Sequence, residues 1–164
     1  MNQADTVNKI STDGQFLSFT LGGEDYGIDI LRVQEIKGWE EARSLPDTPE
    51  YVKGVLDLRG DIVPIIDLRT RFNLVKANYT PTTVIIVLSV KKEGNSYIVG
   101  IIVDGVSDVI DVNTTEVRNT PELGVHISTK YITGIITQNG RMIVLLDIDK
   151  LFNTEDLSIT DASI

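Results

Sequence analysis

A segment of 23 residues occurs twice in this chain, and the repeat constrains the fold more than any other feature of the sequence. Residues 51–73 (YVKGVLDLRGDIVPIIDLRTRFN) return as residues 131–153 (YITGIITQNGRMIVLLDIDKLFN), always 80 positions later. The identical positions include one Tyr, two Gly, one Asp, one Phe and one Asn. Many other pairs exchange one aliphatic side chain for another. The repeat predicts a body of two similar units. Differences between the copies then point to candidate functional positions.

The repeat extends upstream of these segments with a smaller offset. Gly27 matches Gly100 and Glu35 matches Asp108, both 73 positions apart. Copy one therefore covers roughly residues 16–74 and copy two roughly residues 84–153. We expect the following division: a flexible N-terminal tail over 1–14, a first β-barrel over 15–82, a second β-barrel over 83–154 and a C-terminal tail over 155–164. The sequence leaves open whether the two barrels exchange strands.

The apolar pattern between the two tails is mostly that of β-strands. Short runs rich in Val and Ile, separated by Gly, Asp and Asn, occur at 16–21, 27–30, 83–90 and 96–103. Such runs are typical of an all-β sandwich or barrel. Residues 67–74 and 147–152 predict one or two helical turns, and the Asp that begins each suits a helix cap or a turn. Each copy has only about 60 residues, which is small for independent stability, so we expect two barrels that share a core.

The composition argues against several classes of function. The chain has 15 Lys and Arg against 24 Asp and Glu, and the resulting net charge of −9 repels nucleic acids and anionic membranes. It has no Cys, which removes thiol nucleophiles and suits a reducing compartment. The N-terminal residues lack the apolar core of a signal peptide, and no apolar run approaches the ~20 residues that span a bilayer. We therefore expect a cytoplasmic protein with no nucleic-acid partner and no direct membrane contact.

Enzymatic chemistry has little support in the sequence. His126 is the only histidine, and an acid–base mechanism needs a partnered base. A hydrolase that uses Asp57 and Asp61 can be formulated, but no nucleophile, base or metal-ligand set accompanies these carboxylates. No His/Cys cluster suits zinc, and no glycine-rich loop suits phosphate. We predict no catalysis, no cofactor and no metal.

The charge differences between the copies include a group around one glycine. The residues concerned are Asp57, Arg59 and Asp61 in copy one, and Thr137, Asn139 and Arg141 in copy two. The recurring Gly54 and Gly60 fit a backbone role, either a turn with positive φ or packing too close for a Cβ. Residues 57–61 then form a hairpin tip with Arg59 at the surface. Arg59 has two interpretations of equal weight, a solvated side chain and an anchor of a binding interface. The second is favoured by the enrichment of Arg in binding hot spots and by the absence of this charge from copy two.

Residues 54–68 (GVLDLRGDIVPIIDL) resemble the signature segment of the CheW family, the coupling proteins of bacterial chemotaxis. Residues 16–36, 83–90 and 99–109 resemble this family in order and spacing, so the resemblance covers nearly the whole chain. It implies two intertwined SH3-like, five-stranded β-barrels with a few short helical turns, and no catalysis. It also implies a scaffold that joins the cytoplasmic tips of methyl-accepting chemoreceptors to the regulatory domain of the histidine kinase CheA, in arrays at the inner face of the membrane.

The resemblance implies a receptor-binding surface. Arg59 and Glu35 match a surface ion pair on the receptor-binding side, and Val33, Gly54 and Val109 match positions in or near the receptor groove. An exposed ion pair contributes only ~0–1 kcal/mol to stability, whereas a charge pair on a groove rim can orient a partner. The receptor tip is a helical hairpin in this family, so the expected contact is a helix lying in a groove.

The resemblance also implies an interface that joins adaptors and kinases into rings. Arg118, Glu122 and Leu123 match this segment, although the family often has Phe at the position of Leu123. The alternative function is a stand-alone β-barrel interaction module with an unrelated signalling partner. Such a module would bind neither a chemoreceptor tip nor CheA.

Overall fold

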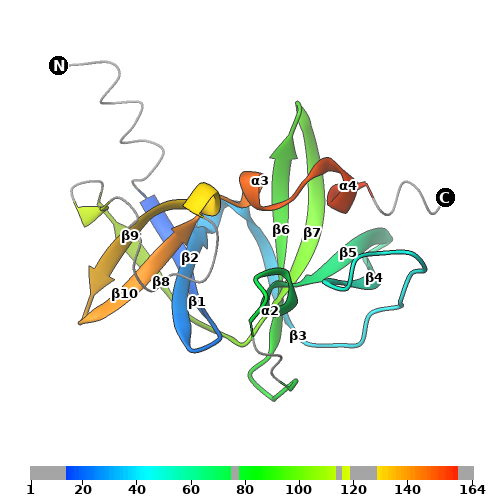
Figure 1. The fold of residues 1–164 in the computed structure, drawn as a ribbon, viewed down its shortest axis with the longest axis horizontal. Helices are drawn as coiled ribbons and strands as arrows, with labels where there is room; N and C mark the ends of the chain where they lie inside the picture. Colours follow the sequence, from blue (N-terminus) through cyan, green and yellow to red (C-terminus); the bar gives the residue numbers. More distant parts are fainter. Residues whose placement is uncertain (1–13, 75–77, 114–115, 119–128, 159–164) are drawn as a thin grey trace.

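The computed structural model describes residues 14–74, 78–113, 116–118 and 129–158, which fold mainly into β-strands (Figure 1). The strands are β1 (Gly14–Leu21), β2 (Glu24–Asp29), β3 (Val33–Gly38), β4 (Val52–Leu58), β5 (Asp61–Asp67), β6 (Val84–Lys92), β7 (Asn95–Val103), β8 (Gly105–Val112), β9 (Ile132–Gln138) and β10 (Arg141–Leu146). The short helical segments are η1 (Ile30–Arg32), α2 (Leu68–Arg71), η3 (Thr129–Tyr131), α3 (Ile148–Leu151) and α4 (Thr154–Leu157). None of the described helices is long and apolar enough to cross a membrane.

The strands form two five-stranded sheets, which confirms the predicted fold class. Sheet A has the order β8-β1-β2-β10-β9, and sheet B has the order β3-β6-β7-β5-β4. The two sheets lie side by side, with sheet A on the left in Figure 1. Their parallel pairs have matching registers, because Gly27 lies opposite Leu145 in sheet A and Gly100 lies opposite Ile65 in sheet B. The duplication seen in the sequence is therefore a duplication of structure.

The boundary expected between residues 82 and 83 does not separate the two sheets. Sheet A takes β1 and β2 from copy one and β8, β9 and β10 from copy two, and sheet B takes the remaining strands. The chain crosses from sheet A to sheet B at η1 and returns at Asp104. Each exchange is held by a parallel pair of strands: β2 pairs with β10, and β7 pairs with β5. In each of these pairs, one strand comes from each copy of the repeat.

Each sheet closes into a barrel through one short backbone bridge. Arg43, which follows β3, exchanges two backbone hydrogen bonds with Val55 of β4, at 2.8 and 2.9 Å. Arg118, which follows β8, exchanges two with Ile135 of β9, both at 2.9 Å. The two edges of each sheet are therefore connected, which protects backbone groups that would otherwise be free to pair with other chains.

The main apolar core lies between the barrels and draws on both of them. It includes Leu17 of sheet A and Ile86 of sheet B, whereas smaller clusters belong to sheet B, with Ile85 and Val87, and to sheet A, with Phe16. Neighbouring side chains of a strand point to opposite faces, so β6 contributes alternately to its own barrel and to the shared core. Burial on both faces explains why this strand is an almost unbroken aliphatic run.

Two of the short helices directly follow the Asp residues that the sequence predicts as helix caps or turn residues. The side chain of Asp67 accepts a hydrogen bond from the backbone N–H two residues later at 3.0 Å. The side chain of Asp147 accepts the equivalent bond at 3.1 Å. The two helical turns predicted at matching places in the copies are thus confirmed as α2 and α3.

The predicted C-terminal tail is wrong in its first residues, because α4 packs onto the barrels. Asn153 and Asp156 form a reciprocal capping box with hydrogen bonds of 2.7 and 3.3 Å. Leu157 is buried in the shared core. At the other end, β1 already begins at Gly14. Residues 1–13 and 159–164 of the two predicted tails lie outside the described residues.

Candidate partner-binding site

The β4–β5 hairpin carries the charged tip that the sequence predicts. Arg59 and Gly60 form its two-residue turn with φ values of 55° and 89°, as a type I′ turn requires. The carboxylate of Asp57 accepts a hydrogen bond from the N–H of Gly60 at 3.0 Å and so holds the turn. The matching β9–β10 turn contains Asn139 and Gly140, with φ values of 52° and 76°. The backbone is common to both copies, and the guanidinium of Arg59 is what copy one adds to it.

Arg59 forms the ion pair that the family resemblance implies. Its Nη2 lies 3.1 Å from Oε2 of Glu35 in β3, with 84% of the Arg side chain and 29% of the Glu side chain exposed. β3 and the β4–β5 hairpin lie at opposite ends of the strand order of sheet B, so the pair spans the line at which this barrel closes. An exposed pair contributes at most about 1 kcal/mol to stability. The pair therefore does little for the fold, and most of the guanidinium is accessible to a partner.

Gly54 acts through the backbone rather than at the surface. It is buried in β4 with φ of 138°, and a Cβ at this position would overlap the backbone carbonyl of Arg43. Arg43 is the residue whose bridge to Val55 closes the barrel. Gly134 occupies the equivalent position beside the bridge of sheet A. The close-packing role expected for this recurring glycine is confirmed.

The two valines of the predicted groove belong to different barrels. Val33 begins β3, pairs with β6 and is partly buried against the shared core. Val109 lies in β8 of sheet A, where its side chain is 44% exposed. Val33 therefore shares a barrel with Glu35, Gly54 and Arg59, and Val109 does not. A single groove formed by all five residues stays a prediction, and it would have to run across both barrels.

The predicted ring-interface segment is described in part. Arg118 is exposed, and its backbone forms the bridge to Ile135 that closes sheet A. Glu122 and Leu123 lie outside the described residues. The assignment of this segment to an interface stays a prediction.

The carboxylates considered for catalysis have structural roles or are solvated. Asp57 holds the hairpin turn, Asp67 caps α2, and Asp61 is exposed at the start of β5. Within the described part of the chain, no group of three or more His, Cys, Asp or Glu is placed to hold a metal ion. His126 falls outside that part. The described geometry thus offers these side chains no convergent reaction centre.

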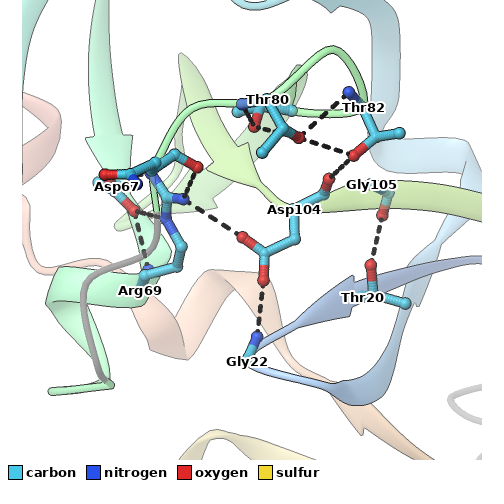
Figure 2. A network of polar contacts seen from close by, with 10 residues as sticks. Thr20, Gly22, Asp67, Arg69, Thr80, Thr82, Asp104 and Gly105 are labelled. Atoms are coloured by element: carbon cyan, nitrogen blue, oxygen red, sulfur yellow. Dashed lines mark hydrogen bonds and ion pairs between the residues drawn. The ribbon is translucent and has the colours of Figure 1, made fainter.

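A buried ion-pair network that was not predicted from the sequence lies where the chain returns to sheet A (Figure 2). Arg69, whose side chain is 2% exposed, donates to the carboxylate of Asp67 from Nε at 3.0 Å and from Nη2 at 2.9 Å. Its Nη1 donates to Asp104 at 3.3 Å, and Asp104 accepts a second bond from the N–H of Gly22 at 2.8 Å. The hydrogen bonds to Asp67 raise the pKa of the Arg69 guanidinium. The network ties α2 and the β1–β2 turn to the crossing point between the barrels.

A second network lies at the other crossing, where α3 contributes a carboxylate in place of the arginine that α2 contributes to the first. Arg32 of η1 donates two hydrogen bonds of 2.7 Å to Asp149 of α3, which also accepts from the N–H of Lys91 at 2.8 Å. Burial raises the pKa of Asp149, but its contacts with Arg32 and Lys91 outweigh burial and leave that pKa below its usual value. Asp149 occupies the repeat position of Arg69. This mismatch of opposite charges was the signal that could have revealed both networks.

Comparisons with known proteins agree with this architecture. The family model described as CheW-like domain matches residues 15–156. The chain is 46% identical over 159 residues to the chemotaxis protein CheW of Klebsiella aerogenes, covering 95% of this chain and 93% of that protein. It is 33% identical over 148 residues to the chemotaxis protein CheW of Bacillus subtilis, covering 90% and 92%. The crystal structure of the scaffolding protein TtCheW from Thermoanaerobacter tengcongensis superposes with a TM-score of 0.76 at 30% identity, covering 88% of this chain and 90% of that one. The chain therefore belongs to the family of CheW-like proteins.

Proposed function

We propose that the chain is a non-enzymatic adaptor that couples methyl-accepting chemoreceptors to the histidine kinase CheA. The observation that carries this proposal is the 46% identity, over 95% of the chain, to a chemotaxis protein CheW. The similarity to a solved scaffolding protein supports the same role. The adaptor works in the cytoplasm and reaches the inner face of the membrane through its receptors.

The receptor-binding surface of this proposal is centred on the tip of the β4–β5 hairpin. Arg59 is exposed and held by Glu35, so it can orient a helix that lies against sheet B. Val33 and Val109 supply aliphatic walls from the two barrels. Gly54 contributes by letting the segment that includes Arg43 pack onto β4. The chemical class of the ligand is thus an amphipathic helical hairpin with an acidic or polar group opposite Arg59.

A second surface, which includes Arg118, Glu122 and Leu123, joins the adaptor to CheA regulatory domains in rings. Signalling through the adaptor is conformational: the state of the receptor changes how the adaptor presents the kinase regulatory domain and shifts the kinase between on and off populations. The intertwined barrels suit this role. A displacement of one barrel is transmitted to the other because the two share a core and two ion-pair networks.

Co-sedimentation with receptor-containing membranes tests the proposed function. The protein is mixed with membranes that contain a chemoreceptor, with or without CheA, and with matched membranes that lack the receptor. We expect the adaptor to sediment with receptor membranes only, and to bring CheA into the pellet. Failure to bind the receptor and CheA would refute the coupling function and favour the alternative, a stand-alone interaction module with another partner.

A further inference from the structure

One pocket of this acidic protein is lined by cations. A pocket of about 420 Å³ lies beside α3, α4 and η3 and is lined by Arg71, Lys92, Lys130, Tyr131, Lys150, Leu151, Phe152, Asn153 and Thr154. Four of these nine described residues are basic and none is Asp or Glu. Since the whole chain has a net charge of −9, such a concentration of positive charge runs against the average charge of its surface. Like charges gathered in one place repel one another, so the arrangement favours an anion between them.

Arg71 is held rigidly by neutral groups. Its guanidinium lies over the rings of Tyr51 and Tyr131, with Cζ 5.2 and 5.3 Å from the two ring centroids. Its Nη2 donates to the hydroxyl of Tyr131 at 3.0 Å and to the carbonyl of Leu151 at 3.2 Å. The Nε atom is buried without a hydrogen-bond partner in the described structure. These contacts fix the guanidinium but do not neutralise its charge.

The lysines around the pocket also contact mainly neutral groups. Lys92 Nζ donates to the backbone carbonyl of Asp149 at 2.7 Å, and Lys130 Nζ lies 5.0 Å from the centroid of the Tyr131 ring. Lys150 reaches the carboxylate of Asp147 only at 4.0 Å, the outer limit of an ion pair. The carboxylate of Asp149 already faces Arg32 and the N–H of Lys91. Most of the positive charge of the pocket is therefore available to a ligand.

Two of the four pocket cations distinguish the copies of the repeat. Lys130 and Lys150 of copy two occupy the repeat positions of Glu50 and Thr70. The tyrosines at equivalent positions of the two copies, Tyr51 and Tyr131, also differ in the charge of their partners. The hydroxyl of Tyr51 donates to the carboxylate of Asp156 at 2.7 Å, whereas the hydroxyl of Tyr131 accepts from Arg71. Burial raises the pKa of Tyr131, but hydrogen bonds and charge from Arg71 and Lys130 outweigh it and lower that pKa.

We propose that this pocket binds a small, multiply charged oxyanion of the phosphate class, held by Arg71, Lys130 and Lys150. Several cations match a ligand with more than one negative charge, and arginine and lysine are the side chains that phosphate groups favour. The volume exceeds that of a single phosphate and suits a diphosphate or a larger phosphate ester. The site lies outside the receptor-binding and ring segments described above, so it does not depend on the proposed coupling function.

Calorimetric titration with inorganic pyrophosphate, in a low-salt buffer free of other phosphates, tests the proposal on the full chain. The test variant is the double substitution Lys130→Gln and Lys150→Gln, which removes two exposed cations of the pocket. The matched control is Lys37→Gln and Lys53→Gln, which changes the net charge equally on strands β3 and β4 of sheet B. Thermal unfolding of both variants checks that each keeps the wild-type fold.

We expect the wild type and the control to bind pyrophosphate, and the pocket variant to bind it about tenfold more weakly, equivalent to about 1.4 kcal/mol. Bound pyrophosphate should also raise the melting temperature of the wild type. The site would be refuted by wild-type protein that binds no pyrophosphate, or by equal losses in pocket and control variants. Citrate serves as a second probe: tighter binding of citrate than of pyrophosphate would overturn the phosphate assignment in favour of a carboxylate ligand.

Discussion

Replacement of Arg69 by Met should reveal how much the buried network between the barrels contributes to stability. Removing one partner of a buried ion pair costs about 3–5 kcal/mol, because the other charge is left uncompensated. Here Asp67 is 1% exposed but keeps its hydrogen bond from the backbone N–H of residue 69 at 3.0 Å. Asp104 is 26% exposed and keeps its bond from Gly22, so water can replace the guanidinium there. Because both carboxylates keep other partners, we expect the free energy of unfolding to fall by about 3 kcal/mol, the lower end of this range.

Urea denaturation of Arg69→Met measures this loss, and calorimetry should show a melting temperature lower by about 6–12 °C, at about 2–4 °C for each kcal/mol. The matched control is Arg32→Met at the other crossing, where the ion pair has 23% and 30% of its side chains exposed. Because water partly screens that half-buried pair, we expect a smaller loss, about 1–2 kcal/mol. A loss for Arg69→Met below about 1 kcal/mol, or one equal to that of the control, would refute the assigned role of burial.

Three further predictions concern the closing segment and the titrating groups. Gly54→Ala should destabilise the protein by about 2–3 kcal/mol in urea denaturation because its Cβ would overlap Arg43, against about 1 kcal/mol for Gly60→Ala, where the Cβ meets open space. Burial and a hydrogen bond to an α4 carboxylate raise the pKa of Tyr51 from 10.0 to about 12, so stability should fall as the pH rises from 10 to 12, and Tyr51→Phe should reduce this fall. Asp149 has a lowered pKa, so its contribution is present above its ordinary pKa and is lost as the pH falls through the folded value. Arg32→Met should therefore move acid unfolding to higher pH.

Distinct outcomes would contradict each of these predictions. Equal losses for Gly54→Ala and Gly60→Ala would show that contact with the closing segment does not matter. An unchanged alkaline profile in Tyr51→Phe would show that the bond to α4 does not couple Tyr51 ionisation to folding. Acid unfolding of Arg32→Met at the wild-type pH would remove Arg32 as the cause of the lowered Asp149 pKa.

Much of the backbone structure could be predicted because the two copies of the repeat can be compared with each other. Gly60 and Gly140 occupy the same position in two equivalent turns, and Asp67 and Asp147 cap two equivalent helices. Each of these identities therefore marked a requirement of the backbone. Gly54 belongs to the same class, since it recurs where a closing segment crosses β4. The position of Arg59 on a hairpin tip followed directly from this reasoning.

The partition of strands between the barrels could not be predicted in the same way. Equivalent strands of the two copies have similar patterns, so periodicity does not distinguish a partner in the same copy from one in the other. The capped helix α4 was missed although the signal was local: Asn153 and Asp156 have the spacing of a capping box. Arg69 was missed for another reason: a buried arginine cannot be told from an exposed one without its partners. In the alignment of the two copies, Arg69 is equivalent to Asp149. This difference in charge, which lies beyond the hairpin, would have identified Arg69 as a candidate.

The most direct test of the proposed receptor surface is the affinity of the Arg59→Asp variant for receptor-containing membranes. Arg141→Asp is the matched control, because Arg141 lies at the equivalent hairpin, is 64% exposed and also forms an ion pair, with Asp25 at 2.7 Å. A binding hot spot contributes about 2 kcal/mol or more, so we predict roughly thirtyfold weaker binding for Arg59→Asp, near wild-type binding for Arg141→Asp, and unchanged binding of CheA by Arg59→Asp. Wild-type receptor affinity in Arg59→Asp would contradict the account and remove the β4–β5 hairpin tip from the receptor-binding site.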